Sequence, residues 1–427
     1  MFETIVGQSA VTQLARDKAN RRLAPSLLFS GPPSSGKGSA ALELARVLAC
    51  EQPDAPADCA CASCFRHSLL VDPDTLSLGS RLFYAEICAA AAVFQRGEKA
   101  GRHLFIRSVK KLLARFSPVL WEDDPKLGKL SAYLSALEED LDALDPAVKQ
   151  KQVDALLKNA LKLESEGMSD LIPIAQIRRA AYWSHLAPTS GTRKFLVLEN
   201  ADRMQDGARN ALLKLLEEPP ASITIVLTTA REGTLLPTIL SRVRPYRFLQ
   251  RPSGDEAEVI RRVFHDESDK GIAAYLDSFL PVSVAKLRPL AAFLAASIAT
   301  KTVYLLRQAG QPLPEELVAL GKSAMQASEA AGLGRPATDS KAVIAKVLAD
   351  AGNFELRSLF QPFLSGLLAL LAADDADSPN LGRDVWRTYT GEAANAVGTY
   401  NQSPALALER LMTALPAELA YRYGGLE

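Results

Sequence analysis

The sequence lacks the marks of a membrane-spanning or exported protein. Its longest nearly apolar stretches, around residues 289–299 and 364–373, are shorter than the ~20 residues that a membrane span needs. The first residues contain no basic region leading into an apolar run, so no secretory signal is expected. We therefore expect no membrane span and a cytoplasmic location.

The sequence also has no excess of either charge, and it has few cysteines. Lys and Arg together number 49, as do Asp and Glu, so global attraction to nucleic acid is absent and any DNA contact must be local. Five cysteines are too few for a disulfide scaffold in 427 residues. Four of them, Cys50, Cys59, Cys61 and Cys64, share one short segment, which in a reducing compartment favours metal binding.

The chain is long enough for several domains. Its 427 residues correspond to about three domains, and 48% apolar with 23% charged residues is typical of a soluble globular protein. We predict an α/β domain at 1–252, which includes a cysteine module at 50–64 and a helical insertion at about 78–170. A small helical domain at 253–335 and a helical bundle at 336–427 are expected to follow.

Strands and helices alternate in the predicted α/β domain. Short apolar runs at 26–30, 194–198 and 223–228 have the character of buried strands. Helical patterns at 38–50 and 207–218 separate them. This alternation predicts a parallel sheet.

The predicted insertion has segregated charge. Residues 96–115 hold seven basic residues against one acidic, and residues 122–145 hold eight acidic against two basic. We expect a helical hairpin whose two faces neutralise each other or lie in solvent. A surface for DNA or a partner protein is the alternative.

A glycine-rich loop lies between the first predicted strand and helix. Residues 31–37 read Gly-Pro-Pro-Ser-Ser-Gly-Lys, which matches the G-x-x-x-x-G-K core of a phosphate-binding loop. The backbone N–H groups, the helix N-terminus and the lysine charge all favour phosphate there. The next residue should be Ser or Thr to hold Mg²⁺, but it is glycine, and the following serine comes one position too late. The candidate nucleotide-binding residues of this segment are Gly31, Ser34, Ser35, Gly36, Lys37, Gly38 and Ser39.

A second candidate element lies at the ends of two later strands. P-loop ATPases need a strand-end carboxylate to hold magnesium and often an adjacent Glu to polarise water. Glu199 suits the first role, although it also suits an ordinary polar strand end, and Asn200 is a poor base. Thr228 is a candidate sensor of the γ-phosphate or of water. Gly38 and Asn200 together predict nucleotide binding that is weak, structural or without turnover.

The cysteine cluster suits zinc. Zn²⁺ takes four tetrahedral ligands, and Cys50, Cys59, Cys61 and Cys64 supply four thiols. Four protein ligands leave no open position for water, so we expect a structural ion; free thiols are the alternative, and His67 is a possible replacement for one thiol. We expect the fifth cysteine, Cys88, to be a small core residue.

The ordered motifs resemble those of the clamp-loader AAA+ ATPases of bacterial DNA polymerase III, the delta-prime subunit more than gamma/tau. Roughly 200 residues carry the resemblance. Besides the loop and the cysteines, the matching motifs lie at 5–8, 72–74, 172–178, 199–204, 210–220, 236–242 and 401–409.

The resemblance implies an AAA+ P-loop sheet with helices on both faces, a helical lid and an all-α collar for oligomerisation. It implies a subunit of the DNA polymerase III holoenzyme that works in a hetero-pentamer with delta and gamma/tau. That complex loads the sliding clamp onto primed DNA. A structural zinc ion at the four cysteines also follows from the resemblance, while ATP and Mg²⁺ at the subunit's own site stay open.

Residues 241–242 match the family's Ser-Arg pair, which makes Arg242 a candidate arginine finger that reaches ATP on a neighbouring subunit. Delta-prime members commonly keep this finger while their own loop has decayed, so we expect no ATP hydrolysis by this chain. Lys286 and Arg288 are candidates for a second sensor in the lid. An ATP-hydrolysing gamma/tau-type motor is the alternative, and a P-loop metabolite kinase ranks last.

Overall fold

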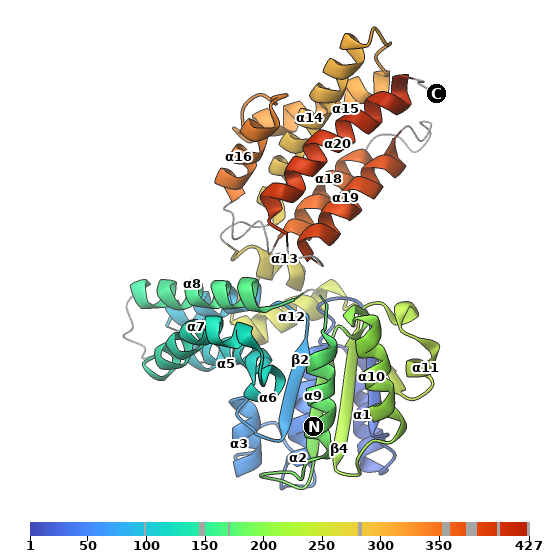
Figure 1. The fold of residues 1–427 in the computed structure, drawn as a ribbon. Helices are drawn as coiled ribbons and strands as arrows, with labels where there is room; N and C mark the ends of the chain where they lie inside the picture. Colours follow the sequence, from blue (N-terminus) through green and yellow to red (C-terminus); the bar gives the residue numbers. More distant parts are fainter. Residues whose placement is uncertain are drawn as a thin grey trace. The chain divides into compact units, whose positions relative to one another are not determined.

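The computed structural model describes residues 1–97, 100–144, 150–169, 171–280, 284–351, 359–372, 382–398 and 402–424 (Figure 1). The chain forms two compact units, Met1–Leu280 and Pro281–Glu427. Helices of the predicted lid, 253–335, therefore occur in both units. The division into three domains stays a prediction.

A five-stranded parallel sheet forms the centre of the first unit. Its spatial order is β2-β3-β4-β1-β5, and every residue of β1, β3 and β4 is buried. Burial on both faces is typical of parallel strands and explains their apolar sequences. The strands are β1 (Ser26–Ser30), β2 (Thr75–Gly79), β3 (Lys194–Glu199), β4 (Ile223–Thr229) and β5 (Arg244–Arg247).

The register brings the carboxyl ends of the central strands to one edge. Phe29 of β1 pairs with Thr228 of β4, and Gly79 of β2 pairs with Glu199 of β3. The glycine-rich loop follows β1 directly. The predicted loop, the acidic strand end and the candidate sensor therefore meet at this edge, where ligands bind in open α/β sheets.

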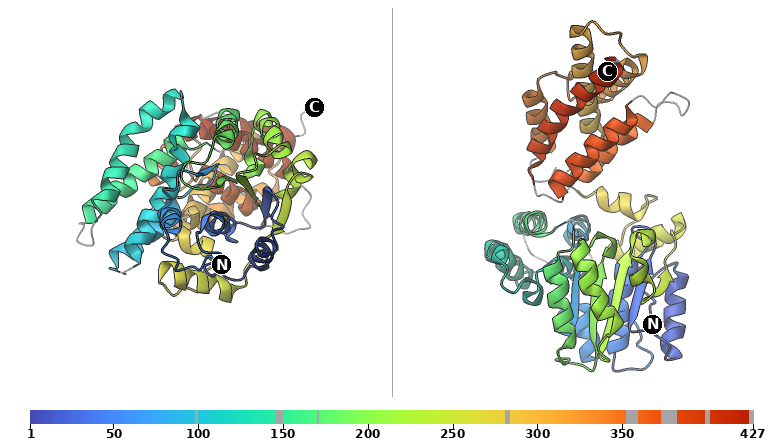
Figure 2. Two further views of the ribbon diagram at one scale, coloured as in Figure 1. Left: turned by 90° about the horizontal axis from the view of Figure 1, so that it is seen from below. Right: turned by 45° about the vertical axis from the view of Figure 1, so that its right-hand side comes forward.

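Helices cover both faces of the sheet, with α9 and α10 on one face and α1 and α2 on the other (Figures 1 and 2). The aromatic rings of Phe29, Tyr246 and Phe248 pack beneath α1 and α2, with centroids 5.9 and 5.2 Å from Phe29 to its two neighbours. These observations confirm the predicted α/β class. The helices are α1 (Ser9–Ala19), α2 (Lys37–Ala49), α3 (Ala62–Ser68), α9 (Ile174–His185), α10 (Asp206–Glu217), α11 (Pro237–Leu240), α12 (Ser253–Phe264) and α13 (Ile272–Asp277).

The insertion between β2 and α9 consists, in its described residues, of helices joined by short non-helical segments. The predicted insertion began at about residue 78, but residues 78 and 79 belong to β2, because the strand pairs with β3 up to Gly79. The pairing of the helices differs from the expected hairpin, because the basic α5 packs mainly on α4 and the acidic α7 packs on α8. Apolar contacts decide this pairing: Phe105 of α5 stacks on Phe94 of α4 at 5.7 Å. The helices are α4 (Tyr84–Gln95), α5 (Gly101–Leu113), η1 (Ala114–Phe116), α6 (Pro118–Trp121), α7 (Pro125–Asp142) and α8 (Gln150–Gly167).

The described part of the second unit is helical. The central helix, α14, packs against α15, α18 and α20. Residues 287–308 of α14 are long and apolar enough to cross a membrane, which we did not expect from the sequence, but 67% of the apolar window is buried inside the protein. Its composition therefore matches that of a core helix. The helices are α14 (Val284–Gln308), α15 (Glu315–Ala330), α16 (Ser340–Ala351), α18 (Phe360–Ala372), α19 (Arg383–Gly398) and α20 (Pro404–Gly424).

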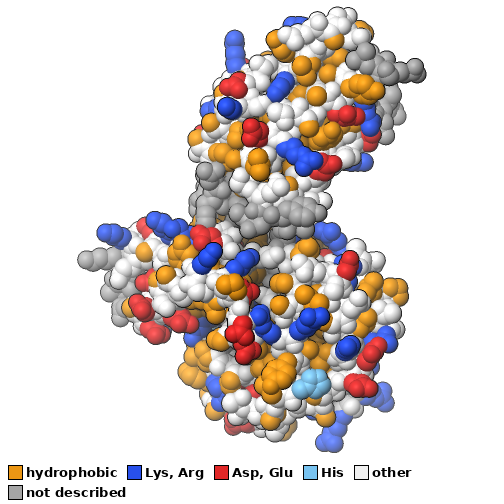
Figure 3. Space-filling view, viewed as in Figure 1, with side chains coloured by type: hydrophobic (Ala, Val, Ile, Leu, Met, Phe, Trp, Pro, Cys, Tyr) orange, Lys and Arg blue, Asp and Glu red, His pale blue; other side chains and the backbone are white. Residues whose placement is uncertain are grey.

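The motif at 401–409 contains the start of α20, although Asn401 lies outside the described residues. On the face drawn in Figure 3, basic and acidic side chains are interspersed, in keeping with equal numbers of the two charges.

Candidate nucleotide and zinc sites

The glycine-rich loop has the backbone conformation that its sequence predicts. Gly31 and Gly36 have φ angles of 148° and 92°, and Ser34 has 59°. A Cβ at Gly31 would lie 2.1 Å from the carbonyl oxygen of Phe248, so only glycine fits there. The loop leads into the N-terminus of α2, where N–H groups without helical partners favour an anion.

Lys37 folds back onto its own loop. Its Nζ donates to the carbonyl oxygens of Gly31 at 2.7 Å and Pro32 at 2.5 Å, and to Ser35 Oγ at 3.2 Å. Burial, followed by the charge of Arg81, lowers the lysine pKa to about 8. The ammonium group thus closes the loop, and it must exchange these partners to contact phosphate.

Two arginines of the insertion hold Glu199 at the end of β3. Arg81 Nη1 donates to Glu199 Oε1 at 3.0 Å, and Arg115 Nη2 pairs with Oε2. Arg115 is buried, and burial together with the charge of Arg81 lowers its pKa to about 9. Both carboxylate oxygens are therefore engaged.

A side chain at the position after the loop lysine would meet the ion pair of Arg81 and Glu199. A Cβ at Gly38 would lie 2.3 Å from Glu199 Oε1 and 2.6 Å from Arg81 Nη1. The usual Ser or Thr would have to displace the ends of these two side chains. Gly38 is buried, whereas Ser39 is exposed.

The remaining strand-end residues lie beside Glu199. Asn200 has a left-handed backbone, with φ 57° and ψ 53°, and its N–H donates to Thr228 Oγ1 at 3.3 Å. The neighbouring Thr229 hydroxyl donates to Asp202 Oδ1 at 2.8 Å. The register thus brings Thr228 next to the candidate acidic element, as its sequence position suggests.

Three arginines of this region were not singled out from the sequence. Arg251 donates from Nε to Val6 O at 3.0 Å and from Nη1 to Ser34 O at 2.6 Å, which ties the motif at 5–8 to the loop. Arg81 and Arg115, described above, come from the insertion. None belongs to a local motif, so no sequence signal identified them.

Arg242 lies at the surface just after α11. Its side chain is 33% exposed, and Nη2 pairs with Glu217 Oε1 of α10 at 2.8 Å. Nη1 donates to Thr238 O at 2.8 Å. Of the two candidate lid sensors, Arg288 is exposed on α14, and the side chain of Lys286 lies outside the described residues.

The four clustered cysteines come together. Their sulfur atoms all lie within 4.8 Å of one another, and Cys50 Sγ is 3.6 Å from Cys59 Sγ. Four Zn–S bonds of ~2.3 Å in a tetrahedron place sulfurs about 3.8 Å apart, so the set fits zinc. Burial opposes ionisation of Cys61, but hydrogen bonds from the backbone of Glu51 and Cys64 lower its pKa to about 7.

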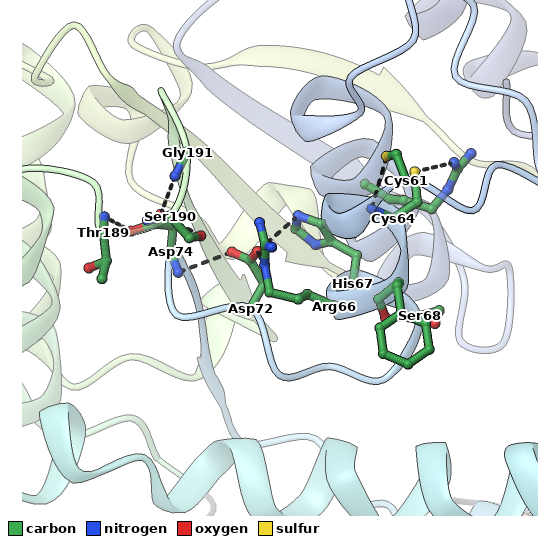
Figure 4. Close-up of polar contacts among 12 residues, drawn as sticks. Cys61, Cys64, Arg66, His67, Ser68, Asp72, Asp74, Thr189, Ser190 and Gly191 are labelled. Carbon is green, nitrogen blue, oxygen red and sulfur yellow. Dashed lines mark hydrogen bonds and ion pairs between the residues drawn. The ribbon is translucent and has the colours of Figure 1, made fainter.

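His67 is not a member of this sulfur group. Its Nε2 lies 3.9 Å from Asp72 Oδ2 (Figure 4). Its ring packs edge-on against Phe195. Cys88 is a buried residue of α4, as expected.

Asp74, in the motif at 72–74, has a structural role. Its carboxylate accepts the N–H groups of Thr189, Ser190 and Gly191 at 2.7, 2.7 and 3.1 Å (Figure 4). These bonds hold the pKa of Asp74 below its usual value although burial raises it. The motif therefore fixes the loop before β3.

Comparisons with known proteins match parts of the chain to subunits of DNA polymerase III. The chain is 39% identical over 80 residues to DNA polymerase III subunit delta' of Pseudomonas aeruginosa, which covers 19% of this chain and 24% of that protein. It is 25% identical over 109 residues to subunit gamma/tau of Mycobacterium tuberculosis, which covers 26% of this chain and 18% of that protein. The matches thus span about a quarter or less of the length of these relatives.

A solved structure, a DNA polymerase III gamma subunit-related protein from Thermotoga maritima, aligns with 97% of this chain and all of that chain at 17% identity and a TM-score of 0.35. A family model described as DNA polymerase III, delta subunit, matches residues 7–117 and 136–252, which is more than half of the 427 residues. The chain therefore belongs to this family of DNA polymerase III clamp-loader subunits.

Proposed function

We propose that the chain is a delta-prime-like subunit of a bacterial clamp loader, which binds nucleotide without hydrolysing it and lends Arg242 to a neighbouring ATP site. In this proposal it works in the cytoplasm within the DNA polymerase III holoenzyme. It assembles with delta and gamma/tau into a hetero-pentamer that loads the sliding clamp onto primed DNA. Its AAA+ domain would be residues 1–252, its lid residues 253–335 and its collar residues 336–427.

The observation that carries the proposal is the engagement of Glu199 by two arginines. Hydrolysis at a P-loop needs a strand-end carboxylate and a hydroxyl to hold Mg²⁺, and a base or a positioned water. Glu199 has both oxygens in ion pairs with Arg81 and Arg115, and Gly38 has no hydroxyl. Asn200 is an amide and cannot act as the base.

The loop itself supports nucleotide binding. Its glycines have the required backbone angles, and the N-terminus of α2 and Lys37 favour phosphate. The proposed site also includes Ser34 and Ser35 of the loop and Thr228 of β4, at the edge of the sheet where the loop begins. Catalytic groups are impaired while binding groups remain.

The surface position of Arg242 supports its role as a finger. Its guanidinium is partly exposed and is held by Glu217 and the carbonyl of Thr238. It therefore has a fixed position and stays accessible to a neighbouring subunit. A fixed, fully charged guanidinium stabilises the charge that develops during phosphoryl transfer.

The four cysteines would bind one structural zinc ion that joins the end of α2 to α3.

A gamma/tau-type motor is the second candidate, because the loop from Gly31 to Lys37 matches the phosphate-binding core and gamma/tau proteins are among the relatives. It would require Arg81 and Arg115 to leave Glu199.

The test is an ATPase assay with purified subunits. The isolated chain should hydrolyse ATP negligibly, and Lys37→Ala should not change that rate. In a complex reconstituted with delta, gamma/tau, clamp and primed DNA, Arg242→Ala should lower the DNA-stimulated rate about tenfold or more. Arg247→Ala, at a more exposed arginine of β5, serves as the matched control and should leave the rate unchanged. An Arg242→Ala complex as active as wild type would refute the finger.

A further inference from the structure

The family's magnesium ion does not fit the residues of this loop. In P-loop sites the ion is held by the hydroxyl after the loop lysine and by a strand-end carboxylate. Position 38 has no hydroxyl, and both oxygens of Glu199 are in ion pairs. The donor set that Mg²⁺ prefers is therefore missing.

The guanidinium of Arg81 lies between position 38 and Glu199, the two positions that would supply protein ligands to the ion. A Cβ at Gly38 would meet Arg81 Nη1 at 2.6 Å and Glu199 Oε1 at 2.3 Å. The first oxygen ligand and the carboxylate of a magnesium site would converge at this point. Arg81 thus supplies positive charge at the position of the cation.

Three partners hold Arg81 in this position. Nη1 bonds Glu199 at 3.0 Å, Nη2 bonds Glu86 Oε2 at 2.9 Å, and the guanidinium carbon lies 5.0 Å from the centre of the Phe83 ring. The side chain is nevertheless 35% exposed. Arg81 is therefore preorganised while it keeps an accessible edge, and guanidinium binds phosphate oxygens well.

Positive charge surrounds the start of α2. Lys37 is the first residue of the helix. Arg81 Nη1 lies 2.6 Å from where a Cβ of Gly38 would be, and Arg251 Nη2 lies 2.6 Å from where a Cβ of Gly36 would be. The helix N-terminus adds its own positive end. This environment suits the negative charge of a phosphate chain without a further cation.

We propose that the loop binds the phosphates of a nucleoside di- or triphosphate without a divalent cation, with the Arg81 guanidinium in the place of Mg²⁺. This inference rests on the proposed nucleotide site. Lys37 exchanges its carbonyl partners for a phosphate oxygen, and Arg81 contacts phosphate while it keeps its bond to Glu199. No bond of the nucleotide is broken.

The experiment titrates the full chain with ADP by calorimetry, in excess EDTA and in excess MgCl₂. We expect the two dissociation constants to agree within about threefold. Binding that weakens tenfold or more in EDTA would overturn the inference, as would the absence of ADP binding in both buffers. Neither result touches the role of Arg242, which the ATPase of the assembled complex tests separately.

Variants at position 81 sharpen the test. Arg81→Ala should weaken ADP binding in EDTA about tenfold or more. Arg96→Ala is the matched control, because Arg96 is also ion-paired, is 38% exposed and contacts Asp266 at 2.9 Å, away from the loop. Wild-type affinity in Arg81→Ala would overturn the inference, provided that circular dichroism shows a folded protein.

The comparison of the two buffers uses the unmodified chain, so it decides the inference even if Arg81→Ala does not fold. A double variant tests the exchange of Arg81 for the ion in the opposite direction. Arg81→Ala with Gly38→Ser removes the guanidinium and adds the missing hydroxyl. Its ADP binding should become dependent on Mg²⁺, with at least tenfold tighter binding in MgCl₂ than in EDTA. Equal binding in the two buffers would count against the exchange of Arg81 for the ion.

Discussion

Glu199 shows how the neighbours of a residue decide its chemistry. A carboxylate at the end of a buried strand beside a phosphate loop is suited to a metal ion. Here Arg81 and Arg115 take both of its oxygens, and both arginines are distant in sequence from β3. Position in the sequence predicted the carboxylate, but contacts across the fold decide what it can bind.

A buried glutamate in the insertion should make stability depend on pH. Glu164 of α8 is 2% exposed and accepts the N–H groups of Phe83 and Tyr84 at the start of α4. Burial raises its pKa from 4.5 to about 7, although these hydrogen bonds oppose the shift. The folded state thus binds this proton more tightly than the unfolded state does, so the residue's contribution to stability falls as pH rises from about 4.5 to 7.

The measurement compares wild type with Glu164→Gln by urea unfolding between pH 5 and pH 8. The variant should gain stability relative to wild type as pH rises, by an amount on the order of 3 kcal/mol over the whole range. A difference between the two proteins that does not change with pH would contradict the shifted pKa of Glu164.

At the scale of the elements, the cysteine module connects the end of α2 to α3. Cys50 follows α2 directly, and Cys61 caps the start of α3 by accepting the N–H of Cys64 at 3.4 Å. Arg46 of α2 also donates to Cys64 Sγ at 3.2 Å. A zinc ion on the four sulfurs would therefore hold two helices together.

Metal analysis of the purified chain should find about one zinc ion per chain. Cys61→Ala should lose most of it, because three ligands bind a structural ion less tightly than four. Cys88→Ala is the control, since Cys88 lies in α4 and outside the sulfur cluster, and it should keep the zinc. Removal of the ion with a chelator should lower the melting temperature of wild type but not of Cys61→Ala. Zinc at the wild-type level in Cys61→Ala would refute the site.

At the scale of the whole molecule, each unit has its own core. The second unit packs its helices around α14, whose apolar side chains face α15, α18 and α20. Two cores are expected in a chain of this length, because a single core stops growing beyond ~250–300 residues.

Truncation in this second core should be costly. Leu294 of α14 is fully buried, so Leu294→Ala should destabilise the unit by about 2–5 kcal/mol through lost burial and a cavity. Tyr304→Ala changes an exposed residue of the same helix and should cost much less. Thermal melts followed by circular dichroism would measure both, and equal losses would contradict the assignment of α14 as a core helix.

The sequence by itself determined the parallel sheet, the phosphate loop, the cysteine cluster and the helical second half. Each of these depends on local properties: apolar runs, glycine backbone angles, closely spaced thiols and helical periodicity. The ordered motifs also carried the resemblance to clamp-loader subunits, and the family match confirms that family.

Only the tertiary structure decided what surrounds the loop. Three arginines, Arg81, Arg115 and Arg251, reach it from positions that have no motif. Their placement depends on how the insertion packs against the sheet and on the path of the chain after β5. Buried apolar contacts likewise decided the pairing of α5 with α4. Opposite charge alone would have paired the basic α5 with the acidic α7. Contacts between residues far apart in the chain follow from packing, which local patterns do not encode.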